Sequence, residues 1–157
     1  MEYVFTYVEE YGIELEEDYG YSVSTYYGSN DECLYDEDVV AAYPVSDWLT
    51  VSSVYSSPEV VIENDAIKLS LIQSGPMSIA IDALPSLWYS SGVQSGDDCT
   101  MVLDHGVTLV GYGVDTGVDY WLIKNSWSAD WGEDGYYRVV RGQNTCGLAS
   151  DVIHTIV

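Results

Sequence analysis

Residues 104–127 read DHGVTLVGYGVDTGVDYWLIKNSW, and this stretch decides the fold of the chain. Two apolar runs flank the turn residues Asp115-Thr116-Gly117, which is the pattern of two neighbouring strands joined by a hairpin. His105 opens the first run and Asn125 follows the second. Antiparallel pairing of these strands predicts that the imidazole and the carboxamide lie side by side. A carboxamide beside an imidazole fixes which ring nitrogen carries the proton, which is what a general base requires.

The rest of the sequence predicts one or two helices followed by several strands. Apolar residues at helical spacing predict a helix over residues 2–10 that ends at Gly12. Ser57-Pro58-Glu59 has the pattern of a helix start, and that helix runs to about Gln73 before Gly75-Pro76 stops it. Strands are expected over 77–83, 105–113, 119–125, 135–141 and 151–156, with an irregular strand over 40–55 interrupted by Pro44 and a loop over 84–98. The class is therefore α+β with an antiparallel, barrel-like sheet.

Composition excludes several classes of partner. The chain has 157 residues, 26 of them acidic and 4 basic, with a formal net charge of −22. This charge argues against nucleic acid and anionic membranes as partners, because phosphate binding needs a basic surface. No apolar run reaches the ~18–20 residues that span a bilayer, and the first residues lack the pattern of a signal peptide. The acidic clusters at 14–18 and 31–38 lack the spacing of a calcium loop, so we expect neither a metal nor a cofactor.

A family resemblance rests on motifs that cover nearly the whole chain. The segments 104–113, 120–127 and 131–136 resemble the histidine and asparagine blocks of the papain-like cysteine proteases. The resemblance extends upstream through 75–83, weakly to 11–13 and 19–21, and downstream to Cys146-Gly147-Leu148. It implies a papain-like fold in which residues 1–40 are the remnant of the helical domain and an acidic loop. Residues 41–157 would form the β-rich domain that carries the catalytic histidine and asparagine.

The resemblance also implies roles for individual residues. His105 would be the catalytic general base, Asn125 would orient its ring, and Trp127 would cover their hydrogen bond. Asp151 would lie on the floor of the pocket for the second side chain before the cleaved bond, where a carboxylate favours Arg or Lys. The alternative for Asp151 is an ordinary surface acid. The substrate-binding residues implied in this way are Ala80, Leu103, Asp104, Gly106, Trp127 and Asp151.

The three cysteines do not include an obvious nucleophile. By the resemblance, Cys99 and Cys146 form a disulfide that closes a loop of roughly 45 residues and stabilises the fold by about 3–4 kcal/mol. Cys33 matches a cysteine whose partner lies in a part of the family that precedes this sequence; a free thiol or an intermolecular bridge are the alternatives. None of the three stands in the Cys-Gly-Ser-Cys-Trp-like segment that carries the family's nucleophile.

The missing nucleophile leaves three interpretations open. We expect the C-terminal portion of a papain-like thiol protease, inactive alone, that acts on peptide or protein substrates once a missing N-terminal segment brings the cysteine. The alternatives are a non-catalytic pseudo-protease that binds or inhibits, and one chain of a two-chain protease. The resemblance and the expected disulfide imply a lysosomal, vacuolar or extracellular setting.

Overall fold

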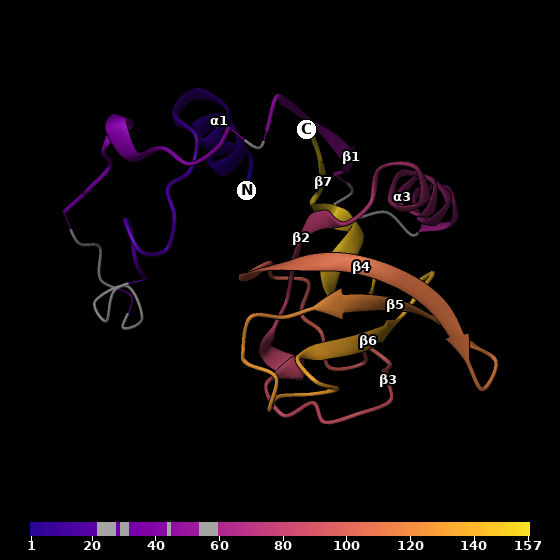
Figure 1. Ribbon diagram of the computed structural model, residues 1–157. Helices are drawn as coiled ribbons and strands as arrows, with labels where there is room; N and C mark the ends of the chain where they lie inside the picture. Colours follow the sequence, from indigo (N-terminus) through magenta and orange to yellow (C-terminus); the bar gives the residue numbers. More distant parts are fainter. Residues whose placement is uncertain (22–27, 29–31, 44, 54–59) are drawn as a thin grey trace. The chain divides into compact units, whose positions relative to one another are not determined.

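The computed structural model describes residues 1–21, 28, 32–43, 45–53 and 60–157, and for residues 60–64 only the backbone is described. Pro44 and the predicted helix start at Ser57-Pro58-Glu59 lie outside the described residues. Short 3-10 turns cover Glu37–Val39, Leu84–Ser86 and Thr145–Ser150. The helices and strands, shown in Figure 1, are α1 (Glu2–Tyr11), β1 (Asp47–Ser52), α3 (Val60–Ser74), β2 (Met77–Ile81), β3 (Val93–Gln94), β4 (His105–Asp115), β5 (Val118–Lys124), β6 (Tyr136–Val140) and β7 (Val152–Ile156).

Contacts divide the chain into two compact units. The larger unit contains Met1 and Leu49–His154, and the smaller contains Glu2–Trp48 and Thr155–Val157. All four Lys and Arg residues of the chain lie in the larger unit, at positions 68, 124, 138 and 141. The smaller unit therefore contains acidic residues but no Lys or Arg.

One open sheet of mostly antiparallel strands organises the structure, in the order β1-β7-β2-β4-β5-β6-β3. The predicted hairpin is present: β4 and β5 pair antiparallel, and Asp115 and Val118 are the paired residues next to the turn. Thr116 and Gly117 both have positive φ, at 48° and 84°, as the twist of a two-residue hairpin turn requires. β2 pairs with β4 so that Ala80 lies opposite Gly106. The α+β class is confirmed.

Some boundaries differ from the sequence-based expectation. The predicted loop over 84–98 contains β3, a two-residue strand that pairs parallel with β6. β2 ends at Ile81 and not at residue 83, because the Asp82 side chain accepts a hydrogen bond from the Leu84 N–H and turns the chain. Among the described residues of 40–55, only Asp47–Ser52 form a strand. A two-residue strand has no detectable sequence period, so β3 could not be predicted by alternation.

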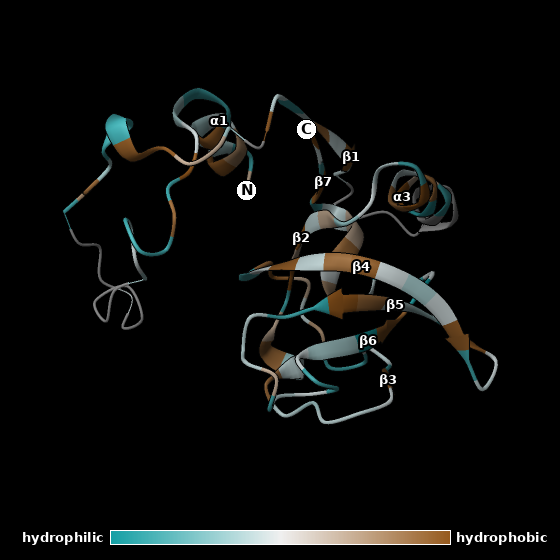
Figure 2. Ribbon diagram, viewed as in Figure 1, coloured by the Kyte–Doolittle hydropathy of each residue, from teal (hydrophilic) through white to brown (hydrophobic). Residues whose placement is uncertain are grey.

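The core of the larger unit lies where alternate residues of the central strands meet helix α3. Ile79, Leu109 and Ile123 come from β2, β4 and β5, and each is fully buried. Ile67 and Leu71 of α3 belong to the same cluster. Figure 2 shows the apolar stretches of β4 and β5 in brown. Burial of one face of these strands fixes their register, and with it the positions of the residues at the strand ends.

The smaller unit is built around α1 and an aromatic cluster. Gly12 ends the helix with φ +74°, and a Cβ there would lie 2.6 Å from Val40 Cγ1. The rings of Tyr7, Tyr11 and Tyr35 pack together, and the Tyr35 hydroxyl donates to the Tyr11 carbonyl. No residue of α1 is buried. Among the described residues, no helix has the length and apolar character needed to cross a membrane.

Candidate active site

His105 is the first residue of β4 and is held at the edge of the sheet by its neighbours. Its Cα pairs with that of Ile81 at the end of β2. The preceding Asp104 donates its N–H to the Ile81 carbonyl at 3.0 Å and accepts a hydrogen bond from the Ala83 N–H at 2.9 Å. The backbone that carries the imidazole is therefore fixed from both sides.

Asn125 lies directly after β5, and its buried side chain meets the imidazole. The Asn125 N–H donates to the Gly135 carbonyl at 2.9 Å, which closes the loop that follows. His105 Nε2 and Asn125 Oδ1 are 2.9 Å apart. The Ser126 N–H donates to the same Oδ1 at 2.8 Å, which identifies this atom as the amide oxygen. An amide oxygen only accepts, so Nε2 must carry the proton, and Nδ1 of the neutral ring keeps the lone pair.

Aromatic rings cover this hydrogen bond. The Trp127 indole stacks on the His105 ring with centroids 4.9 Å apart and planes at 25°. Trp131 meets Trp127 edge-on at 5.1 Å, and Tyr137 and Tyr89 extend the packing toward the core. Apolar surroundings strengthen the imidazole–carboxamide bond because they exclude competing water.

An ion-pair network, which the sequence did not reveal, holds the loop that carries both indoles. Glu133 accepts from Arg138 Nη2 at 2.6 Å and Nε at 2.8 Å, and also from the Gly92 N–H. Arg138 Nη1 donates to Asp115 at 2.6 Å. These hydrogen bonds from Arg138 lower the pKa of Glu133 from 4.5 to about 2. The scarcity of basic residues was the available signal, since an arginine among so many acids is expected to be paired.

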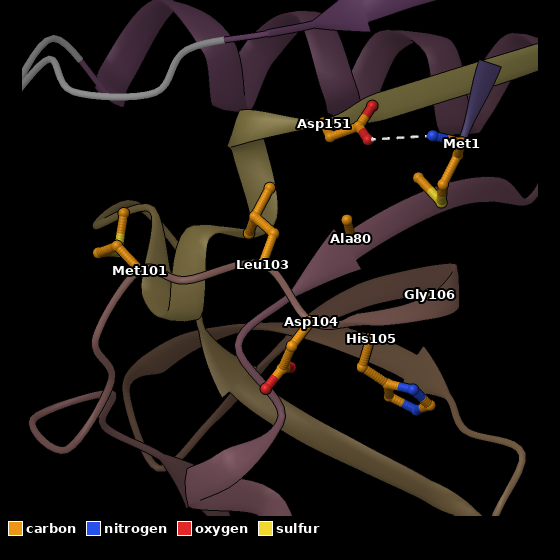
Figure 3. Close-up of a pocket in the computed structure, with 8 residues that line it drawn as sticks. All are labelled: Met1, Ala80, Met101, Leu103, Asp104, His105, Gly106 and Asp151. Atoms are coloured by element: carbon orange, nitrogen blue, oxygen red, sulfur yellow. Dashed lines mark ion pairs between the residues drawn. The ribbon is translucent and has the colours of Figure 1, made fainter. Parts of the chain in front are cut away.

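A cavity of about 560 Å³ adjoins His105. Five of the six predicted substrate-binding residues line it, whereas Trp127 lies on the His105 ring instead. Ala80 and Gly106, opposite each other in the strand register, have small or absent side chains that leave this space open. In Figure 3 the Asp151 carboxylate faces the amino group of Met1, at 3.8 Å. The lining residues are Met1, Ala80, Met101, Leu103, Asp104, His105, Gly106 and Asp151.

The disulfide that the resemblance implied is present. Cys99 and Cys146 form a disulfide that joins the loop before β4 to the turn before β7. Cys33 is an exposed free thiol in the smaller unit. Within the described ranges, no group of three or more His, Cys, Asp and Glu side chains is placed to hold a metal ion.

Comparison with known proteins links this geometry to one family. The model of the papain family cysteine proteases matches residues 1–156. Cysteine proteinase 15A of Pisum sativum is 37% identical over 153 residues, which cover 92% of this chain and 38% of that protein. Cathepsin L of Sarcophaga peregrina is 37% identical over 156 residues, or 96% of this chain and 42% of that protein. The chain thus spans well under half the length of these relatives.

Solved structures give the same answer for the fold. Digestive procathepsin L 3 of the Tenebrio molitor larval midgut superposes with a TM-score of 0.80 at 35% identity, covering 98% of this chain and 47% of that one. The bromelain protease of Ananas comosus, solved with an inhibitor, superposes with a TM-score of 0.76 at 28% identity, covering 98% and 67%.

Proposed function

Because the chain belongs to the papain family of cysteine proteases, we propose that it provides the general base and a specificity cavity of a cysteine endopeptidase site. The observation that carries this proposal is the 2.9 Å contact between His105 Nε2 and Asn125 Oδ1, with the amide oriented by Ser126. This contact leaves Nδ1 as the basic atom. In a neutral imidazole, that is the atom able to take a proton from a thiol.

The chemistry follows from that arrangement. Nδ1 of His105 takes the proton of a cysteine thiol, and the thiolate attacks the carbonyl carbon of the substrate peptide bond. The imidazolium then gives this proton to the departing amine, which leaves an acyl thioester. Nδ1 next takes a proton from water, the resulting hydroxide attacks the thioester, and the cysteine leaves. Asn125 keeps the ring oriented throughout, and Trp127 keeps water from their hydrogen bond.

The thiolate in this proposal comes from residues outside the 157 printed here. Cys99 and Cys146 are joined to each other, and Cys33 stands in the segment Glu32-Cys33-Leu34, unlike the family's nucleophile segment. A preceding segment of the same polypeptide, or a second chain, would bring it. The finding that none of these three cysteines fits the nucleophile segment also favours a second candidate, a non-catalytic module that binds or inhibits peptidases.

The smaller unit offers a surface for such a segment. Helix α1 has no buried residue, and Tyr3 and Val4 are 91% and 62% exposed. Exposed apolar side chains of this size on a helix face are typical of a surface that is covered in the complete protein. We therefore propose that residues 1–40 are the end of the helical domain, whereas residues 41–157 form the β-rich domain.

The cavity supports a preference for substrates with a basic side chain two positions before the cleaved bond. Asp151 lies in the cavity wall with 20% of its side chain exposed. A substrate side chain bound in the cavity would therefore contact its carboxylate. Ala80 and Gly106 leave room for the aliphatic part of Arg or Lys. A charge pair in a partly enclosed site favours these residues over leucine.

The disulfide indicates the kind of compartment in which the protein acts. Cys99–Cys146 needs an oxidising environment to form and persist. We therefore propose a lysosomal, vacuolar or extracellular setting, where the large negative charge also keeps the protein in solution.

The proposal is tested by supplying the missing cysteine. The chain is fused to the preceding part of the catalytic domain of a papain-family relative, and a fluorogenic dipeptide substrate is used with the fusion, with its His105→Ala variant and with the chain alone. We expect turnover by the fusion only, blocked by a thiol-directed epoxide. A folded fusion without turnover would contradict the proposal, and tight binding of the chain to active peptidases would then favour the inhibitory candidate.

A further inference from the structure

A buried carboxylate with no part in the proposed chemistry lies behind the cavity wall. Asp82 follows β2, is 2% exposed and does not line the cavity. Its Oδ1 accepts the Leu84 N–H at 3.1 Å. Its Oδ2 accepts both the N–H and, at 2.7 Å, the hydroxyl of Thr100. Leaving a charge in such a place is costly unless its oxygens are satisfied, and here both oxygens are.

The same residue joins the two segments that the disulfide links. The Asp82 N–H donates to the Cys146 carbonyl at 2.8 Å, while its carboxylate holds Thr100, the neighbour of Cys99. Asp82 thus fixes the start of segment 100–104 from one side, and the disulfide fixes it from the other. Burial raises the pKa of Asp82, but the hydrogen bonds from Thr100, Leu84 and Met101 outweigh it and bring the pKa below the usual value.

Segment 100–104 forms a wall of the cavity. Met101, Leu103 and Asp104 all belong to it, and Met101 adopts a left-handed conformation with φ +66°. A non-glycine residue in that conformation is strained and needs surrounding contacts to keep it there. Leu103 packs closely on Gly147, where an added Cβ would lie 2.6 Å from Leu103 Cδ2. The contacts at Thr100 and at Gly147 therefore hold this wall of the cavity in one close-packed position.

We propose that Asp82 is a positioning residue for substrate specificity: its carboxylate holds segment 100–104 in place and so sets the shape of the cavity that receives the substrate side chain. This inference rests on the proposed function of that cavity. The residue acts through Thr100 and touches neither the substrate nor the reacting atoms.

The decisive variant is Asp82→Asn, which keeps the size of the side chain but replaces one acceptor oxygen with a donor. The amide cannot accept hydrogen bonds from both the Leu84 and the Thr100 sides, so one backbone N–H loses its partner. The matched control is Asp97→Asn, because Asp97 is an exposed acid of the same loop whose carboxylate accepts from the Ser95 hydroxyl. Thr100→Val, which removes one of the donors, is the second variant and does not depend on Asp82→Asn folding.

The first measurement is amide hydrogen exchange by NMR on the 157-residue chain. We expect the amides of residues 100–103 to exchange at least about tenfold faster in Asp82→Asn, as the loss of a charge-assisted hydrogen bond implies. This acceleration is expected to exceed that of the Leu109 amide in the core, which reports the change in global stability. Thr100→Val is expected to accelerate exchange at residues 100–103 by a smaller factor. Adding Thr100→Val to Asp82→Asn is expected to give no further acceleration. Unchanged exchange at 100–103 would overturn the proposal.

The second measurement separates positioning from general stability, and uses the active fusion. KM is expected to rise several-fold in Asp82→Asn for peptides with arginine at the second position before the cleaved bond, with kcat within about twofold. For peptides with glycine there, KM is expected to be unchanged, since no side chain enters the cavity. An equal rise for both peptides would overturn the proposal. If the unmodified fusion shows no turnover, the proposed function fails, and hydrogen exchange still decides the role of Asp82.

Discussion

The substitution Glu133→Gln tests whether the ion-pair network stabilises the loop that carries Trp127 and Trp131. A pKa lowered from 4.5 to about 2 corresponds to about 3 kcal/mol of stability, at ~1.4 kcal/mol for each tenfold change in proton affinity. Since 27% of the Glu133 side chain is exposed, solvent screens part of this stabilisation. We therefore expect Glu133→Gln to lower the free energy of unfolding by about 2–3 kcal/mol at neutral pH. In the variant, Arg138 keeps its ion pair with Asp115.

The pH dependence of this loss has a defined sign. The ionised form of Glu133 is favoured in the folded state, so its stabilisation is complete above pH ~4.5 and disappears as the pH falls toward 2. The difference between the two proteins is therefore largest at pH 6–7 and shrinks in acid. Urea unfolding followed by tryptophan fluorescence at pH 7 and pH 3 measures it, with Asp130→Asn, an exposed acid of the same loop, as the control. Equal midpoints at pH 7, or a difference that stays constant in acid, would refute the reasoning.

Three further predictions concern the cavity and its support. Gly147→Ala should lower stability by roughly 1–3 kcal/mol in thermal unfolding, because φ is +75° and the new Cβ meets Leu103; an unchanged midpoint would contradict that close packing. Replacing Cys99 and Cys146 together by serine should cost about 4 kcal/mol in urea unfolding, the chain-entropy value for a separation of 47 residues; a loss under about 1 kcal/mol would argue against it. In the active fusion, Asp151→Asn should lower the preference for arginine over leucine several-fold, and an unaltered ratio of kcat/KM values would show that Asp151 is an ordinary surface acid.

Local sequence patterns predicted the parts of the structure in which neighbours along the chain determine the geometry. The turn at Thr116 and Gly117 set the hairpin, and the hairpin brought His105 toward Asn125. Helix α3 followed from apolar spacing and from the stop at Gly75. The alternation over 77–81 predicted strand β2, whereas its pairing with β4, which places Ala80 opposite Gly106, came only from the structure.

The contacts that sequence reasoning missed join residues without a shared period. Glu133 and Arg138 meet because a loop folds back on β6, and Asp82 reaches Thr100 across a loop of irregular structure. Neither pair lies at a helical or strand spacing, so pattern analysis has no signal for them. β3 is set by its pairing with β6 and not by its own two residues.

The central claim is that His105 is a general base whose basic atom is Nδ1, and the position of its proton tests this directly. Nitrogen-15 NMR of the chain distinguishes the two tautomers of the neutral ring, and a His154→Gln variant assigns the signals, since the chain has 2 histidines. The hydrogen bond to Asn125 predicts that Nε2 carries the proton, with Asn125→Ala weakening that preference. A neutral His105 ring protonated at Nδ1 would contradict the account.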